Sequence, residues 1–89
     1  MKGIITVIGK DSVGIIAKVC TYLAEENINI LDISQTIING YFNMMMIVDV
    51  SQNSAKFEAT VEELKKLGEE IGVDIRLQSE AIFNSMHRI

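Results

Sequence analysis

Apolar and polar residues follow two spacings along the chain, and these spacings predict an alternation of strands and helices. Residues 3–8 form a short run of β-branched side chains that is apolar on both faces, as in a central strand. Residues 13–26 carry apolar side chains at helical spacing, which predicts an amphipathic helix with Ser12 as its N-cap. The stripe expected to be buried consists of Val13, Ile16, Val19, Cys20 and Leu23. Residues 28–38 have no helical period and many β-branched side chains, so they predict the second strand.

A tight turn is predicted between the second and third strands. Asn39 and Gly40 both accept the positive φ that a type I′ turn requires, and this pair is the strongest short hairpin signal. Residues 41–51 then return as the partner strand. Its alternate positions share one face, which we assign to the helices: Phe42, Met44, Met46, Val48 and Val50.

The last third of the chain predicts one more helix and one more strand. Over residues 55–71, apolar and charged side chains separate onto two faces, as in an amphipathic helix. Asn53 or Ser54 is expected to cap its start, and Gly72 to close it in the left-handed conformation. Residues 73–79 alternate between apolar and polar side chains, which predicts the final strand.

The predicted order over residues 1–79 is therefore strand, helix, strand, strand, helix, strand. This is the ferredoxin-like βαββαβ pattern of the α+β class, in which a four-stranded antiparallel sheet carries two helices on one face. Residues 80–89 form a C-terminal tail whose apolar positions recur at helical spacing, which predicts a short helix or extension. We expect this tail to cover part of the open sheet face or to reach a partner subunit, the alternative being a frayed terminus.

Composition narrows the classes of partner. The 89 residues are 48% hydrophobic and carry a formal net charge of −4 without a run of like charges, so a nucleic-acid partner is not expected. No segment approaches the roughly 20 apolar residues of a membrane span, and the N-terminal apolar run is too short for a signal peptide. The lone Cys20 excludes an internal disulfide and fits a reducing compartment. We therefore expect a cytoplasmic protein that binds neither nucleic acid nor a membrane.

Residues that suggest catalysis or metal binding have simpler interpretations. The run 44–46 contains three methionines, but neighbouring strand residues point to opposite faces, so core filling is expected. His87 has no second histidine or cysteine nearby, and Cys20 lies on the stripe expected to be buried. Neither a nucleophile–histidine–acid set nor a phosphate-binding glycine loop is present. We expect no catalytic residues, no cofactor, no metal and no enzymatic activity.

The open face of the sheet predicts a homodimer. Met45 and Ile47 fall on this face, beside one of two sets from the first strand: Ile4 and Ile8, or Ile5 and Val7. An exposed apolar centre is a liability for a monomer. The second strand lies at an edge, open to pairing with its twin. Its polar residues are interpreted as edge polarity or as contacts across an interface: Asp32, Ser34 and Gln35.

The segment "VIGKDSVGIIAKVCTYLAEENINILDISQ" resembles the ACT domain, the small-molecule-sensing module of amino-acid metabolism. The resemblance covers residues 2–79. It rests on a polar loop ending in Gly14, the aliphatic pair Ile15-Ile16, and Asn29-Ile30 at the start of the second strand. The loop "GKDSVGI" is similar to those of the glycine-cleavage-system repressor and formyltetrahydrofolate deformylase. The tail "IFNSMHRI" is similar to that of proteins consisting of one ACT domain, so a free-standing member is expected.

This resemblance implies a site for an amino-acid effector. The helix N-terminus near residues 12–14 suits the ligand's carboxylate, Asp11 accepts from its ammonium, and Asn29 fixes its orientation. Gly14 lets the ligand approach closely. We expect the first loop to pass the start of the second strand, so that the two parts meet beside a dimer interface. The expected ligand-binding residues are Lys10, Asp11, Ser12, Val13, Gly14, Asn29 and Ile30.

The same residues also have a structural interpretation: Asp11 and Ser12 cap the helix, Gly14 serves packing, and Asn29 satisfies a strand end. The sequence is therefore compatible with two functions. The first is a free-standing ACT regulatory module that senses a small, amino-acid-like ligand and modulates an enzyme or regulator. The alternative is a protein–protein interaction or dimerisation module without a metabolite.

Overall fold

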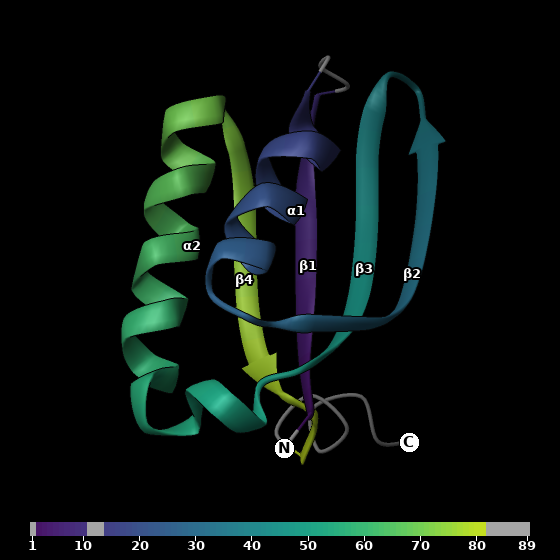
Figure 1. The fold of residues 1–89 in the computed structure, drawn as a ribbon. Helices are drawn as coiled ribbons and strands as arrows, with labels where there is room; N and C mark the ends of the chain where they lie inside the picture. Colours follow the sequence, from purple (N-terminus) through teal and green to yellow (C-terminus); the bar gives the residue numbers. More distant parts are fainter. Residues whose placement is uncertain (1, 11–13, 82–89) are drawn as a thin grey trace.

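The computed structural model describes residues 2–10 and 14–81, apart from the side chains of residues 52–54. Its elements are β1 (Lys2–Lys10), α1 (Ile15–Glu25), β2 (Asn29–Ile38), β3 (Tyr41–Asp49), the 3₁₀ turn η1 (Ser51–Lys56), α2 (Phe57–Ile71) and β4 (Val73–Ser79) (Figure 1). The predicted βαββαβ order is thereby confirmed.

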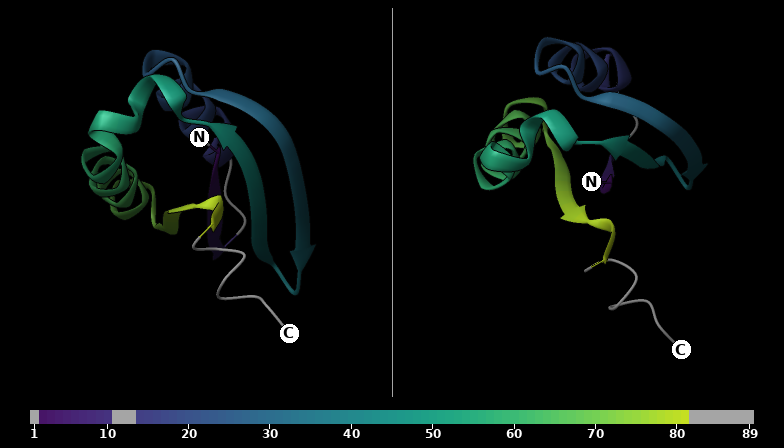
Figure 2. Two further views of the ribbon diagram at one scale, coloured as in Figure 1. Left: turned by 90° about the horizontal axis from the view of Figure 1, so that it is seen from below. Right: turned by 60° about the horizontal axis from the view of Figure 1, so that its bottom comes forward.

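The four strands form one antiparallel sheet in the order β2-β3-β1-β4, with both helices on the same side of it (Figures 1 and 2). Strand β2 is an edge strand, as expected. The register fixes the two ends of the sheet. At one end, a row across β1, β3 and β2 consists of Lys2, Asp49 and Asn29. At the other end, the corresponding row consists of Lys10, Tyr41 and Ile38.

The core lies between the sheet and the helices. The predicted inner face of β3 is confirmed, since Phe42, Met44, Met46 and Val48 are all buried, as is Val50 beyond its end. Buried side chains from α1, α2 and β4 pack against this face: Ile15, Val19, Leu23, Leu64, Ile75 and Leu77. By the register, the open face of the central strands holds Ile4, Thr6 and Ile8 beside Ile47, Met45 and Asn43.

Helix α1 begins later than predicted. Its N-cap is Gly14, with φ at 91°, and no side chain bonds the helix start, so the expectation that Ser12 is the N-cap is wrong. Ser12 and Val13 themselves lie outside the described residues. Ile16, expected on the buried stripe, is exposed because α1 turns that position away from the sheet. Cys20 is half-buried.

Helix α2 also begins later than predicted. The backbone of Ser51–Lys56 forms a 3₁₀ turn, and the N-cap of α2 is Lys56, so the expected capping by Asn53 or Ser54 is wrong. The left-handed conformation of Gly72 is confirmed by its φ of 78°.

The predicted turn between β2 and β3 is confirmed. Asn39 and Gly40 have φ values of 52° and 80°, as a type I′ turn requires. Strand β4 ends at Ser79 as predicted, while residues 82–89 of the predicted tail lie outside the described residues. In the described part of the chain, neither helix is long and apolar enough to cross a membrane.

Candidate functional site

The predicted loop half of the site joins β1 to α1. Lys10 is the last residue of β1 and is exposed, and Gly14 directly precedes α1. Asp11, Ser12 and Val13, which connect them, lie outside the described residues, so their expected roles stay predictions.

Gly14 acts through its backbone conformation. A Cβ placed on it would meet no described atom within 4 Å, so close packing does not require glycine here. The backbone φ of 91° does require glycine, because residues with a side chain rarely adopt that value. The expectation that Gly14 serves packing is therefore wrong.

The first turn of α1 has features that suit an anion. The Gly14 carbonyl accepts from the Lys18 N–H at 3.0 Å, which closes the first helical hydrogen bond. No acidic residue occupies the first turn, and no described side chain caps it. The first backbone N–H groups of a helix have no partner within the helix, and they lie at the positive end of its dipole. A carboxylate fits this position without competition from a described side chain.

The second half of the predicted site lies at the other end of the sheet. Asn29 is the first residue of β2, is exposed, and pairs with Asp49, whereas Ile30 is half-buried and pairs with Val48. Asn29 lies level with Lys2, at the start of β1. Lys10, from which the loop begins, is eight residues further along β1, so it lies about 26 Å from Lys2 at strand spacing. The expectation that the loop and Asn29 meet within one chain is therefore wrong.

Asp49, the cross-strand neighbour of Asn29, is held by the chain that follows it. Its Oδ1 accepts from the Ser51 Oγ–H at 2.6 Å and from the Ser51 backbone N–H at 2.9 Å. These two hydrogen bonds, the hydroxyl one foremost, lower the pKa of Asp49 below its usual value. The carboxylate is therefore charged and already engaged beside Asn29.

A polar contact ties the outer surfaces of the two helices together. The Tyr22 hydroxyl of α1 donates to Glu63 Oε1 of α2 at 2.6 Å. Burial, followed by the bond to Glu63 and its negative charge, raises the pKa of Tyr22 above its usual value. The contact ties α1 to α2 at a residue beyond the first turn of α1.

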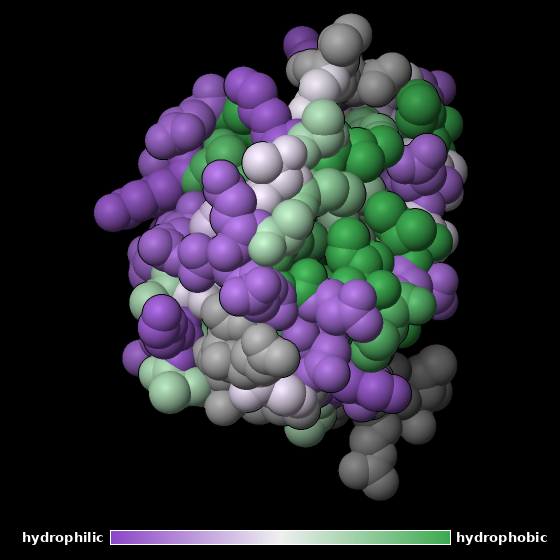
Figure 3. Space-filling model, viewed as in Figure 1, coloured by the Kyte–Doolittle hydropathy of each residue, from purple (hydrophilic) through white to green (hydrophobic). Residues whose placement is uncertain are grey.

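The helices leave the edge strand β2 uncovered. Ile33, Gln35 and Ile37 pair with the buried residues Met46, Met44 and Phe42, so they belong to the helix side of the sheet, yet all three are exposed. We call these three residues of β2 the ledge. Ile33 keeps 44% of its surface exposed and Ile37 57%, and Figure 3 shows apolar surface gathered on this side of the molecule. The ledge cannot be read from the sequence, because alternation predicts which face a residue occupies but not whether a helix covers it.

No described group of three or more histidine, cysteine, aspartate or glutamate residues lies close enough together to hold a metal ion. The predicted site offers backbone N–H groups at the helix N-terminus and the carboxamide of Asn29. Such groups suit hydrogen bonds to an organic ligand.

Comparisons with known proteins identify the family. The sequence profile of the ACT domain matches residues 3–78. A UPF0237 protein of Bifidobacterium longum is 64% identical over 88 residues, covering 99% of this chain and 98% of that protein. An ACT domain protein from Streptococcus pneumoniae superposes with a TM-score of 0.83 at 46% identity, covering 93% of both chains. A formyltetrahydrofolate deformylase from Pseudomonas syringae superposes with a TM-score of 0.78 at 27% identity, covering 88% of this chain and 27% of that one.

ACT domains are in general regulatory modules that bind small-molecule effectors and often dimerise. The fold and these matches lead to one conclusion: the chain belongs to the ACT domain family.

Proposed function

We propose that the protein is an ACT regulatory module that binds a small amino acid between two copies of the chain and passes this signal to an enzyme or regulator. The observation that carries the proposal is the separation of its two halves. The first turn of α1 lies at one end of the sheet and Asn29 at the other, so one chain alone cannot close the site.

Pairing of two β2 edges supports a composite site. A twofold axis that relates two identical edge strands makes them run antiparallel. Asn29 at the start of one β2 then lies level with Ile38 at the end of the other. In the sheet register Ile38 marks the Lys10 end, from which α1 starts. Each dimer would thus have two equivalent sites, each built from the α1 start of one copy and Asn29 of the other.

The ledge supports the same arrangement. Ile33 and Ile37 are exposed on the helix side of β2, where pairing with a twin places a second set of helices beside them. Their burial would supply an apolar contribution to the interface.

The chemistry of the composite site suits a zwitterion. The carboxylate would accept from the N–H groups of the first turn of α1, and Asp11 would accept from the ammonium. Asn29 of the other copy would fix the orientation, because its carboxamide both donates and accepts. The half-buried aliphatic side chain of Ile30, next to Asn29, favours a ligand with a compact side chain.

A calorimetric screen of the twenty amino acids tests ligand binding, and Asn29→Ala should weaken the binding of a hit about ten- to hundredfold. Thr21→Ala, on the exposed side of α1 beyond its first turn, is the control and should leave affinity unchanged. If no amino acid gives heat, the interaction-module alternative replaces the sensor.

Mixing two defective variants tests whether the site is shared between copies. An Asp11→Ala chain and an Asn29→Ala chain each lose binding alone. In a mixed dimer, one of the two sites combines the intact loop of one chain with the intact Asn29 of the other. An equimolar mixture that exchanges subunits should therefore recover about a quarter of the wild-type sites at wild-type affinity. A site contained within one chain would recover none.

A further inference from the structure

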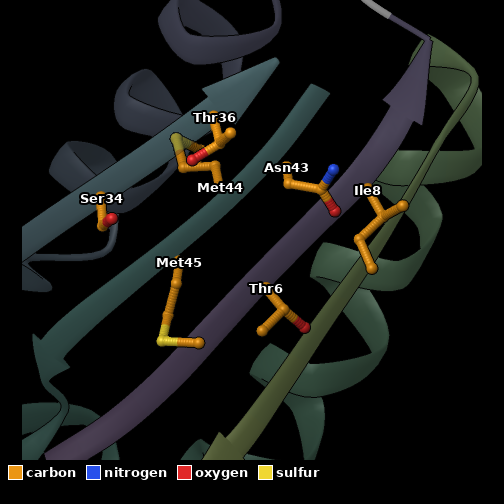
Figure 4. A pocket seen from close by; sticks show the side chains of 7 residues that line it. All are labelled: Thr6, Ile8, Ser34, Thr36, Asn43, Met44 and Met45. Carbon is orange, nitrogen blue, oxygen red and sulfur yellow. The ribbon is translucent and has the colours of Figure 1, made fainter. Parts of the chain in front are cut away.

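The open face of the sheet carries a hollow that the proposed effector site does not use. Its volume is about 240 Å³, and it is lined by Thr6, Ile8, Ser34, Thr36, Asn43, Met44 and Met45 (Figure 4). The helices lie on the other face, and the first turn of α1 is not part of it. We call this hollow the open-face pocket.

Six of these side chains form two short rows across three neighbouring strands. By the register, Thr6, Met45 and Ser34 make one row, and Ile8, Asn43 and Thr36 make the next. Figure 4 shows these residues standing on β1, β3 and β2. Strands lie about 4.8 Å apart, and side chains on one face recur about every 6.8 Å, so the two rows span roughly 10 Å by 7 Å. That area matches a flat molecule of one or two fused rings.

The polar groups of the pocket have unused hydrogen-bonding capacity. Thr6 and Asn43 are half-buried, yet neither side chain makes a hydrogen bond with another described residue, and the same holds for Ser34 and Thr36. Each hydroxyl can donate and accept, and the Asn43 carboxamide offers a donor and an acceptor in one plane. A planar edge that carries a donor beside an acceptor pairs with such a carboxamide through two hydrogen bonds.

The apolar part of the pocket favours a ring. Met45 lies at the centre of its row with 39% of its surface exposed, and Ile8 is 50% exposed at the side of Asn43. A thioether adapts its shape to the ligand and makes favourable contacts with aromatic rings. A polyol would bond the hydroxyl groups but leave this apolar surface uncovered.

None of the described residues that line the pocket is charged. The nearest charges on β4 are Asp74 and Arg76, which pair with Ile8 and Thr6 and form a salt bridge with each other at 3.1 Å. Uncharged lining favours an uncharged ligand over a zwitterion or a phosphate.

We propose that the open-face pocket binds an uncharged, flat heterocycle whose edge carries adjacent hydrogen-bond donor and acceptor groups, as in a free nucleobase. The ring lies over Met45 and Ile8, its donor–acceptor edge pairs with Asn43, and Thr6, Ser34 and Thr36 bond its remaining polar groups. This binding is independent of the proposed amino-acid site.

The experiment is a titration of the full-length chain with adenine, hypoxanthine and uracil, followed by NMR of methionine methyl groups and side-chain amides. At least one base should shift the Met45 methyl and Asn43 amide signals in a saturable way. Myo-inositol, which has hydroxyl groups but no flat apolar face, and alanine, which is a zwitterion, should leave those signals in place. The proposal is overturned if no base moves them at about 10 mM, a concentration that detects even weak binding, or if inositol moves them equally.

Two near-isosteric variants test the assigned contacts. Asn43→Asp removes the amide donor, and Thr6→Val removes a hydroxyl while keeping a β-branched strand residue; each should weaken base binding, Asn43→Asp by tenfold or more. Asn39→Asp, in the β2–β3 turn, and Thr21→Val, on α1, make the same chemical changes outside the pocket and should have no effect. Thermal melts establish whether each variant is folded. If Asn43→Asp does not fold, Thr6→Val alone tests the assigned contacts. Base affinity that is unchanged in a folded pocket variant overturns the proposal.

Discussion

Replacing the ledge isoleucines should weaken dimerisation strongly and leave the fold of the single chain intact. In one chain Ile33 exposes 44% of its surface and Ile37 exposes 57%. The two exposed areas together are about equal to the surface of one fully exposed isoleucine. Complete burial of an isoleucine side chain stabilises by about 1.5–3 kcal/mol. Both copies contribute in a symmetric dimer, so the two residues contribute about 3–6 kcal/mol to association.

The double variant Ile33→Thr, Ile37→Thr keeps strand propensity and one methyl group at each position, so the lower end of that range applies. We expect the dimer dissociation constant to rise about a hundredfold. Sedimentation equilibrium over a micromolar concentration series measures it, and thermal melts of dilute protein should show little change because both side chains are already exposed in the single chain.

Ile38 provides the matched control. It exposes 57% of its surface, the same fraction as Ile37, but belongs to the open face because it pairs with Tyr41. Ile37→Thr should weaken the dimer more than Ile38→Thr does. Equal effects of the two substitutions would refute the assignment of the interface to the helix side, and a strictly monomeric wild-type mass at micromolar concentration would refute the dimer itself.

Three further predictions concern the folded chain. Leu64→Ala should lower the free energy of unfolding by about 2–5 kcal/mol in urea denaturation, because Leu64 is fully buried; a loss below about 1 kcal/mol would contradict the packing described. In a Tyr41→Phe background, absorbance titration of Tyr22 should give a midpoint above its usual pKa near 10. The Tyr22 phenol of the unfolded chain ionises at a lower pH than that of the folded chain. Its contribution to the free energy of unfolding is therefore complete below about pH 10 and is lost as the pH rises further, and a midpoint at 10 would refute the contact between Tyr22 and Glu63. The lowered pKa of Asp49 stabilises the fold above the usual aspartate pKa near 4, so the stability difference between wild type and Asp49→Asn should shrink as the pH falls below that value, and a difference independent of pH would count against it.

Local patterns in the sequence were sufficient for the order of elements. The alternation on β3 identified its inner face, and the positive φ of Asn39 and Gly40 followed from their chemistry. The helix starts were less predictable. Asn53 and Ser54 are good N-cap residues, yet their backbone belongs to a 3₁₀ turn and Lys56 precedes α2 instead. Capping propensity is a preference of about 1 kcal/mol, which tertiary packing easily overrides.

The arrangement of the candidate site was beyond a local pattern. Motif residues identified Gly14 and Asn29, but their separation depends on strand order and register, which pairings distant in sequence determine. Coverage by helices is also a tertiary property. For this reason Ile16 and Ile37 are exposed, although their spacing is that of buried residues.

The position of β2 at the rim of the sheet also governs how the molecule fluctuates. None of its residues is buried, and among the described elements it packs extensively only against β3. Separating β2 from β3 therefore costs much less than global unfolding, so its amides should exchange with solvent through local opening. Strands β3 and β1 each have a strand on both sides and exchange only when the sheet itself opens. The least and the best protected amides thus lie one strand apart, and a copy that pairs along β2 would turn the most labile strand of the monomer into an interior strand of a larger sheet.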